Sequence, residues 1–161
     1  MNTQRRSRRP RRIRLSTLLA LLTLTACTSD APGAPTTPGS APSGPTRITV
    51  TIGEHSYPAT LAEGPTTRDL IDQLPLTLSF TDFNRVEKIA TLPRPLTTQG
   101  VPAGADPEIN DIGYYSPGHN LVLYYGDVGY WNGLVRLGNL PEGMDAIARQ
   151  PDGFTATMAL A

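Results

Sequence analysis

The sequence predicts a mainly β protein, a closed antiparallel β-barrel with one or two short helices. Three observations support this fold class. Several short segments alternate apolar and polar residues, turn-forming residues separate these segments, and only two stretches have helical spacing. About seven short strands within residues 47–161 suggest a closed or nearly closed antiparallel barrel.

The first two strands are predicted from an alternation that one turn interrupts. Isoleucine and valine alternate with threonine over residues 48–52, and the alternation resumes over residues 57–61. Gly53, Glu54 and His55 lie between the two segments. A period of two, broken by a turn, is typical of a strand, a turn and a second strand.

One short amphipathic helix is predicted next. Thr66 precedes residues 67–74, whose leucines and isoleucine have helical spacing, and Pro75 prevents the helix from continuing. Apolar residues alternate again over residues 76–80, so a third strand is predicted directly after the helix.

The clearest hairpin is predicted from two apolar segments, residues 112–115 and 120–125. Residues 116–119 join them, with Pro117 at the second position and Gly118 at the third position of the turn. This order predicts a type II turn, in which the glycine supplies the positive φ.

The remaining segments complete the predicted domain. Residues 91–110 are rich in proline and glycine and are expected to form a long loop or an irregular edge. Alternation predicts two more strands at residues 134–140 and 154–160, with a short helix at residues 144–149 between them.

The first 26 residues have the layout of a secretory signal. Residues 1–14 carry seven arginines, residues 15–26 are apolar, and this run is too short to span a bilayer. The motif Leu24-Thr25-Ala26-Cys27 resembles the lipobox of bacterial lipoproteins. The resemblance implies cleavage before Cys27 and acylation of Cys27, which would anchor the chain to the cell membrane on its extracytoplasmic side.

Removal of the signal would change the net charge. The whole chain is formally neutral, with fourteen basic and fourteen acidic side chains. Seven basic side chains lie in residues 1–14 and all the acidic ones follow Cys27, so the mature chain has a net charge of −7. This charge disfavours nucleic acid as a partner and disfavours electrostatic binding to anionic lipid.

The mature chain divides into a tether and one domain. Residues 28–46 contain five prolines and three glycines with almost no large apolar side chain, so residues 27–46 are predicted to be a lipidated cysteine followed by a disordered tether. Residues 47–161 are enough for one domain. With Cys27 acylated, no thiol remains for a disulfide or a metal site.

Several segments resemble those of bacterial cyclophilin-like fold proteins, over most of residues 47–140. These segments are Leu74-Pro75, the run Asp-Phe-Asn-Arg-Val-Glu-Lys at 82–88, the run Asp-Ile-Gly-Tyr-Tyr-Ser-Pro-Gly at 111–118, residues 121–127, and Leu137-Gly138. The resemblance implies an eight-stranded antiparallel barrel closed by helices.

The same resemblance raises the question of prolyl isomerase activity. Phe83-Asn84-Arg85 is similar to the Phe-His-Arg of true cyclophilins, which would give Arg85 the role of the arginine that stabilises the twisted amide. The middle histidine is missing, and no segment like Gly-Phe-Met follows. A surface ion pair of Arg85 with Asp82 or Glu87 is the alternative interpretation.

A cluster of aromatic residues supplies a second candidate site. Six of the ten aromatic side chains lie within residues 114–131. On alternating strands one tyrosine of each adjacent pair should face the core and the other should face outward, so packing explains half of the cluster. The outward set, Tyr115 and Tyr124 or their neighbours with Trp131, is the predicted ligand-binding groove for a peptide or a small apolar ligand.

No metal and no cofactor is predicted. Asp106, Glu108 and Asp111 cluster in one loop, but their spacing lacks the glycine and the terminal glutamate of a known calcium loop. A solvated acidic loop is the simpler interpretation. The sequence also has no phosphate-binding glycine loop and no zinc-ligand spacing.

These observations predict a membrane-anchored lipoprotein whose domain is a non-catalytic binding module for a peptide, a protein or a small ligand. One alternative is an extracytoplasmic peptidyl-prolyl isomerase with Arg85 at its centre. A second alternative is a structural envelope protein without a ligand. The sequence leaves the oligomeric state open.

Overall fold

A computed structural model describes residues 44–161 of the chain. The predicted signal peptide, Cys27 and residues 27–43 of the predicted tether lie outside the described residues. None of the helices within residues 44–161 is long and apolar enough to cross a membrane.

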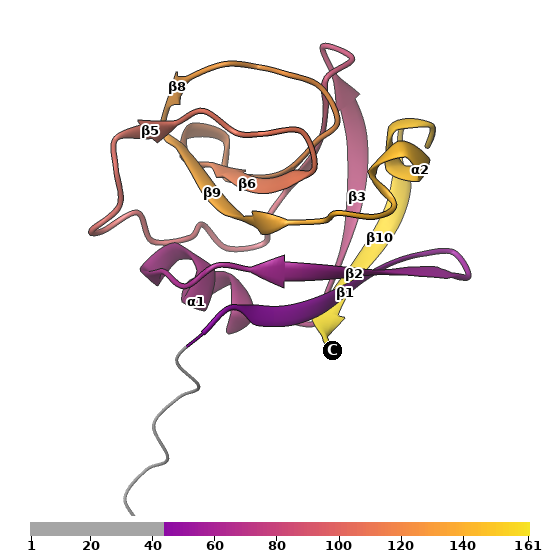
Figure 1. Cartoon of the computed structure of the whole chain (residues 1–161), viewed down its shortest axis with the longest axis horizontal. Helices are drawn as coiled ribbons and strands as arrows, with labels where there is room; N and C mark the ends of the chain where they lie inside the picture. The colour runs from indigo at the N-terminus through magenta and orange to yellow at the C-terminus, as the bar shows by residue number, and fades with distance from the viewer. Residues whose placement is uncertain (1–43) are drawn as a thin grey trace, which may run out of the picture. The chain divides into compact units, whose positions relative to one another are not determined.

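Eight antiparallel strands close into a barrel (Figure 1), which confirms the predicted fold class. The barrel strands are β1 (Thr46–Ile52), β2 (His55–Leu61), β3 (Leu76–Phe83), β4 (Glu87–Thr91), β6 (Asp111–Tyr115), β7 (Asn120–Tyr124), β9 (Leu134–Asn139) and β10 (Phe154–Leu160). Around the barrel, hydrogen-bonded neighbours follow the order β1-β10-β3-β4-β7-β6-β9-β2.

Short elements outside the barrel complete the described fold. They are α1 (Pro65–Ile71), α2 (Met144–Ala148), the 3₁₀ turn η1 (Ser116–Gly118), and a separate two-stranded ribbon of β5 (Gly104–Ala105) and β8 (Trp131–Asn132). Figure 1 shows α1 and α2 on opposite sides of the barrel, with the β5–β8 ribbon outside β9. The two helices agree with the prediction of one or two.

The inward side chains of alternating strands fill the barrel. Every second residue is buried from Leu76 to Phe80 on β3 and from Phe154 to Met158 on β10, as the period of two predicts. Phe80 and Phe154 are directly opposite each other in the register, and their rings stack with centroids 5.4 Å apart. Burial of such rings contributes about 1.5–3 kcal/mol each, so this pair is a major part of the core.

The barrel closes where β2 meets β9, and a glycine permits this contact. Thr60 and Leu61 pair with Asn139 and Gly138 over a short register. A Cβ on Gly138 would collide with the backbone carbonyl of Thr60 and with Cα of Leu61. A larger residue would therefore force the two strands apart at the seam of the barrel.

The first helix begins earlier than predicted. It starts at Pro65 and ends at Ile71, rather than beginning after Thr66. Thr66 therefore lies within the helix rather than before it. Its hydroxyl donates a hydrogen bond to the carbonyl of Thr97, 2.7 Å away, and so holds the long loop in place. Proline at the first helical position suits the helix, because its missing N–H would have no partner there.

The predicted type II turn is wrong. Residues 116–118 form a 3₁₀ turn, and the positive φ of 53° falls on His119, not on Gly118. His119 donates its backbone N–H to the carbonyl of Ser116, and its left-handed conformation then reverses the chain into β7. A Cβ on Gly118 would lie 2.6 Å from Nδ2, the terminal atom of the Asn120 side chain.

Candidate functional site: an aromatic pocket outside the barrel

The floor of the candidate site is the outer face of four neighbouring strands, β4, β7, β6 and β9. Glu87 is opposite Tyr124, and Ile89 is opposite Val122, so these four side chains share the outer face. A small hydrophobic cluster forms there from Val122, Tyr124 and Leu134, with Ile89, Ala105, Tyr115 and Val128 packed against it. Strand β7 is therefore buried on both faces, which explains its continuous apolar run.

The connection from β7 to β9 crosses this outer face and forms the roof of the site. Trp131 Nε1 donates a hydrogen bond to the carbonyl of Val128 at 3.0 Å, and the backbone N–H of Gly133 donates to the carbonyl of Ala103 at 2.7 Å. A Cβ on Gly104 would collide with the carbonyl oxygen of Trp131, so only glycine allows β5 to approach β8 this closely. These contacts hold Trp131 at the rim.

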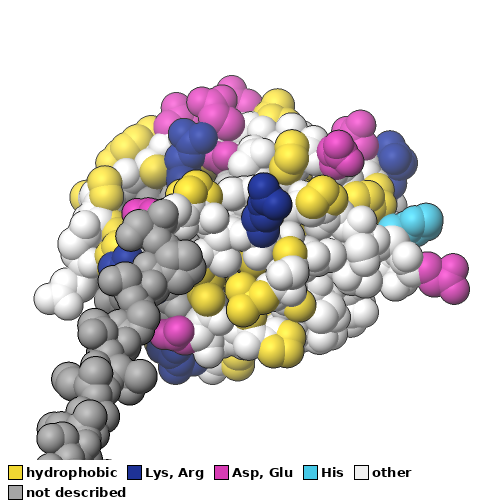
Figure 2. Space-filling model, turned by 60° about the horizontal axis from the view of Figure 1, so that its bottom comes forward, with side chains coloured by type: hydrophobic (Ala, Val, Ile, Leu, Met, Phe, Trp, Pro, Cys, Tyr) yellow, Lys and Arg dark blue, Asp and Glu magenta, His cyan; other side chains and the backbone are white. Residues whose placement is uncertain are grey.

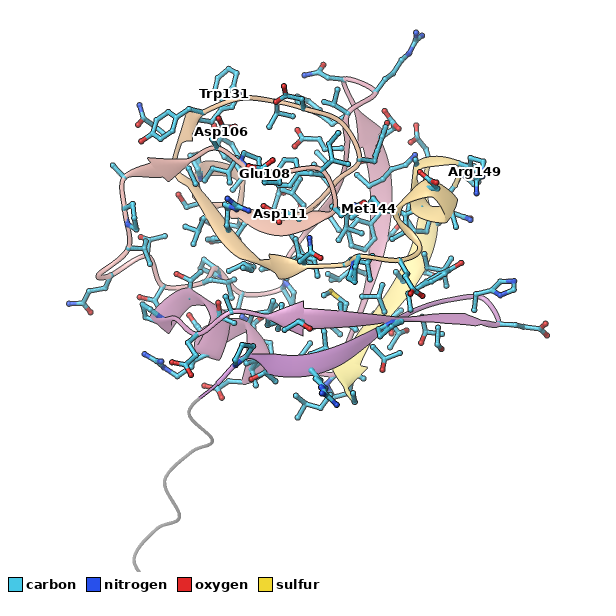
Figure 3. The ribbon with its side chains drawn as sticks, in the orientation of Figure 1. Asp106, Glu108, Asp111, Trp131, Met144 and Arg149 are labelled. Atoms are coloured by element: carbon cyan, nitrogen blue, oxygen red, sulfur yellow. The ribbon has the colours of Figure 1, made fainter. Side chains whose placement is uncertain are left out.

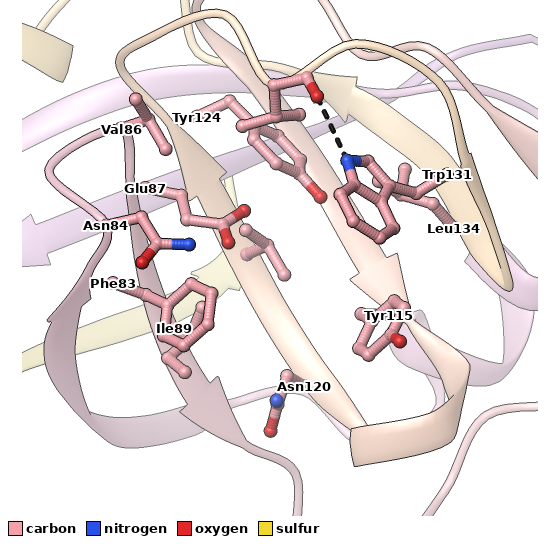
Figure 4. A pocket seen from close by; sticks show the side chains of 12 residues that line it. Phe83, Asn84, Val86, Glu87, Ile89, Tyr115, Asn120, Tyr124, Trp131 and Leu134 are labelled. Carbon is pink, nitrogen blue, oxygen red and sulfur yellow. Dashed lines mark hydrogen bonds between the residues drawn. The ribbon is translucent and has the colours of Figure 1, made fainter.

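Floor, roof and the β3–β4 hairpin enclose a pocket of about 410 Å³, which we call the outer pocket (Figure 4). Pockets for small molecules span roughly 300–1,000 Å³, so its size suits a small ligand. The outer pocket is lined by Phe83, Asn84, Val86, Glu87, Ile89, Tyr115, Asn120, Val122, Tyr124, Val128, Trp131 and Leu134. At its rim, the side chains of Trp131 and Phe83 are 58% and 47% exposed.

Gly113 determines how Tyr124 lies in the floor. Gly113 is directly opposite Val122, two residues before Tyr124 on β7. A Cβ on Gly113 would lie 2.6 Å from Cε2 of Tyr124, so the tyrosine ring occupies the space that a larger residue would fill. The ring is buried, and the missing side chain of Gly113 permits this position.

Glu87 is the one charged side chain that lines the outer pocket. Figure 4 shows its carboxylate pointing into the pocket between Asn84 and Tyr124. Burial raises the pKa of the Glu87 carboxyl above its ordinary value. Burial, and then the negative charges of Glu87 and Asp111, also raise the pKa of Tyr124, so its phenol stays protonated.

The three aromatic residues predicted to bind ligand, Tyr115, Tyr124 and Trp131, all line the outer pocket. Tyr114, the neighbour of Tyr115, faces the core instead, as the strand alternation predicts. The hydroxyl of Tyr114 accepts a hydrogen bond from the backbone N–H of Leu96 inside the core. The structure thus places the outward set together, and its role in ligand binding stays a prediction.

Arg85 lies at the tip of the β3–β4 hairpin, where it is exposed and does not line the outer pocket. Its φ is 60°, and its backbone N–H donates to the Asp82 carboxylate at 3.0 Å. The ion pairs within residues 44–161 do not include Arg85, so the alternative of a surface ion pair with Asp82 or Glu87 is wrong. Asp82 instead pairs with Lys88 at 2.9 Å. A catalytic role for Arg85 stays a prediction.

A polar network lies beneath this hairpin. Lys88, whose side chain is 3% exposed, donates to the carbonyl of Gln150 at 2.8 Å and pairs with Asp82. The hydroxyl of Tyr125 donates to the same Asp82 carboxylate. The Tyr125 and Lys88 hydrogen bonds hold the pKa of Asp82 below its ordinary value, whereas burial and the Asp82 contact raise the pKa of Tyr125 to about 12. Together these bonds fix the hairpin that carries one wall of the outer pocket.

The three clustered acids do not converge. Figure 3 shows Asp106, Glu108 and Asp111 following one another along the segment from β5 to β6. Asp111 instead pairs with Arg136 at 2.5 Å and accepts the backbone N–H of Glu108 at 2.9 Å. Within residues 44–161 no three acidic, histidine or cysteine side chains form a group that could hold a metal ion. That the protein uses no metal and no cofactor stays a prediction.

Sequence reasoning missed the wall of the outer pocket that the β3–β4 hairpin supplies. Phe83, Glu87 and Ile89 reach the pocket because β4 pairs with β7, whose residues lie more than thirty positions later. The available signal was the alternation of Glu87 and Ile89 around Lys88, which puts the first two on one face.

Comparisons with known proteins agree with this fold. A family model described as the cyclophilin-like family matches residues 50–159. The solution structure of a hypothetical protein from Archaeoglobus fulgidus is similar, with a TM-score of 0.59 and 18% sequence identity. The match covers 73% of this chain and 97% of the archaeal chain. No match was found among curated proteins.

Proposed function

The chain belongs to the cyclophilin-like family, and we propose that it is a lipid-anchored extracytoplasmic protein that binds a small organic ligand in the outer pocket. Because a fold does not determine an activity, the proposal depends on the pocket rather than on the family. The observation that supports it is an aromatic pocket with a buried floor and an exposed rim. Burying the exposed part of Trp131 and Phe83 under a ligand would be favourable.

The outer pocket has the chemistry of a binding site more than that of a catalytic site. Its lining combines apolar walls with two amides, two phenols and one carboxylate, and it contains no serine, cysteine, histidine or lysine. A peptidyl-prolyl isomerase centred on Arg85 remains the alternative, although Arg85 does not line the outer pocket. If the protein accelerates cis–trans exchange in a short proline peptide and Arg85→Ala abolishes the effect, the isomerase alternative replaces this proposal.

A saturable change in tryptophan fluorescence on titration with a ligand would test binding directly. Trp131 is the single tryptophan of the chain, so its emission reports on the rim of the outer pocket. We would titrate the full chain, purified in dodecyl maltoside, with 2-phenylethanol, which is transparent at the excitation wavelength of tryptophan. We expect a saturable shift that Tyr115→Ala weakens about tenfold, which corresponds to about 1.4 kcal/mol of lost contact.

Tyr130→Ala is the matched control, because Tyr130 is as exposed as Trp131 but does not line the outer pocket. It should leave the titration unchanged. Equal weakening by both variants would mean that the signal does not come from the pocket.

The proposed membrane anchor depends on Cys27 and is tested separately. The lipobox-like motif before it supports acylation, and residues 28–46 have the composition of a spacer between membrane and domain. The natural chain should carry the mass of the acyl groups and remain in the membrane fraction, whereas Cys27→Ser should lack that mass. If the mass of Cys27→Ser differs from that of the natural chain only by the exchange of sulfur for oxygen, and its distribution is the same, the lipoprotein interpretation is wrong.

A further inference from the structure

The outer pocket combines aromatic walls with a single acid, and this combination specifies a class of ligand. We propose that the ligand is a small organic cation, an ammonium group attached to an apolar body, whose charge is balanced by Glu87. This inference rests on the proposed binding function of the outer pocket and adds the chemistry of the ligand.

The charges around the pocket favour a cation over an anion. Among the lining residues Glu87 is charged, while Asn84, Asn120, Tyr115 and Tyr124 are polar and neutral, and no lysine or arginine is present. The field of the whole domain acts in the same direction, because residues 44–161 carry seven basic and thirteen acidic side chains. On the face shown in Figure 2, acidic side chains gather at the edge while basic ones lie singly.

The carboxylate of Glu87 is available to such a ligand. The ion pairs within residues 44–161 join Lys88 to Asp82, Arg94 to Asp69, and Arg136 to Asp111, so Glu87 takes part in none of them. Nor does its carboxylate form a side-chain hydrogen bond in the described part of the chain. A half-buried charge without a partner is unfavourable, and a bound cation would supply the partner.

The pKa of Glu87 supports this interpretation. Burial raises that pKa in the free protein. An opposite charge within about 4–6 Å favours the ionised form of a carboxyl, so a bound ammonium would lower the pKa again. Binding of a cation and ionisation of Glu87 should therefore strengthen each other.

The aromatic walls suit a cation as well as an apolar body. A cation within about 6 Å of an aromatic face is attracted by the ring quadrupole, and tryptophan gives the strongest attraction. Trp131 and Phe83 offer exposed ring surface at the rim, and Tyr115 stands beside the floor. A ligand with both an ammonium and an apolar group would contact the acid and the rings together (Figure 4).

Three probes of similar size and different charge test the inference. We would titrate the full chain in dodecyl maltoside with 2-phenylethylammonium, 2-phenylethanol and 3-phenylpropionate, and follow the emission of Trp131. We expect the cation to bind about tenfold more tightly than the alcohol and the anion to bind most weakly. Glu87→Gln should remove the advantage of the cation over the alcohol.

Glu54→Gln is the matched control, because it removes the same charge at the exposed β1–β2 turn, outside the pocket lining. Glu54→Gln should keep most of the preference for the cation over the alcohol. Circular dichroism of both variants shows whether the fold is intact, and folding of Glu87→Gln is expected because the side-chain shape is preserved.

The outcomes separate this inference from the proposed function. If the alcohol binds as well as the cation and Glu87→Gln changes neither, the pocket binds ligands but the inference of a cation is wrong. The same holds if the anion binds best. If none of the three probes binds with a dissociation constant below about 10 mM, the weakest value expected for ligands of this size, the proposed binding function fails as well.

Discussion

Adding one methyl group to Gly113 would test how the floor of the outer pocket is packed. In Gly113→Ala the new Cβ would lie 2.6 Å from Cε2 and 3.3 Å from the hydroxyl oxygen of Tyr124. The ring of Tyr124 cannot remain where it is, because carbon atoms pack at about 3.5–4.0 Å. Gly113 has no positive φ, so the backbone itself accepts alanine without strain.

Two opposing contributions determine the expected magnitude. Overpacking a buried contact costs about 1–3 kcal/mol. Replacing glycine by alanine also restricts the unfolded chain, which stabilises the native state by about 0.4–1 kcal/mol. The difference of their midpoints is a net loss of about 1.3 kcal/mol in the free energy of unfolding. The displaced ring should also alter the emission of Trp131, since both residues line the pocket.

Denaturant unfolding, followed by far-UV circular dichroism and by Trp131 emission, measures this loss. The control is the same substitution in a Tyr124→Ala background, where the ring is absent. There Gly113→Ala should be neutral or slightly stabilising, so the two substitutions should be strongly coupled. If Gly113→Ala is as destabilising without the Tyr124 ring as with it, the packing argument is wrong.

Three further predictions concern the charged residues around the hairpin. Burial raises the folded-state pKa of the Glu87 carboxyl above 4.5. The stability that comes from binding this proton is therefore present below pH 4.5 and is lost as the pH rises through the raised pKa. Glu87→Gln should therefore unfold at higher denaturant than the natural chain at pH 7 and at the same denaturant below pH 4.5. The Asp82 pKa is held below 3.8, so its contribution is present above 3.8 and is lost as pH falls through the lowered pKa. Tyr125→Phe should cost about 1–2 kcal/mol and move acid unfolding to higher pH, measured by circular dichroism between pH 2 and pH 6. Lys88→Met should cost about 2–3 kcal/mol, because it leaves Asp82 without its partner, whereas Arg94→Met, whose side chain is 54% exposed, should cost less than about 1 kcal/mol.

The strands of the barrel could be predicted because each has one face in the core. Alternation located β1, β2, β9 and β10 to within a residue or two. It also located the start of β3, whose end at Phe83 lies beyond the predicted residues 76–80. Local turn chemistry was less informative. The order of Pro117 and Gly118 suits a type II turn, but the positive φ falls on His119 instead. Short elements in the proline-rich loop, such as β5, depend on a partner that is distant in sequence.

Only the aromatic part of the candidate site could be predicted from the sequence. Tyr115, Tyr124 and Trp131 lie in a single aromatic cluster of the sequence, and strand alternation was enough to select the outward members. Phe83 and Glu87 belong to a distant hairpin, and only the pairing of β4 with β7 brings them to the same pocket. The local sequence does not indicate which strands pair, because the pairing depends on the closure of the whole barrel.

The β5–β8 ribbon separates the motion of the pocket roof from the stability of the barrel. It consists of the two register pairs Gly104–Asn132 and Ala105–Trp131. Strand β7 instead pairs along its whole length with β4 and over residues 120–123 with β6. Local openings with few broken contacts require far less free energy than global unfolding. The backbone amides of Trp131 and Asn132 should therefore exchange with solvent well before those of β7. A ligand could then enter and leave on the timescale of that small opening, while the barrel beneath it stays closed.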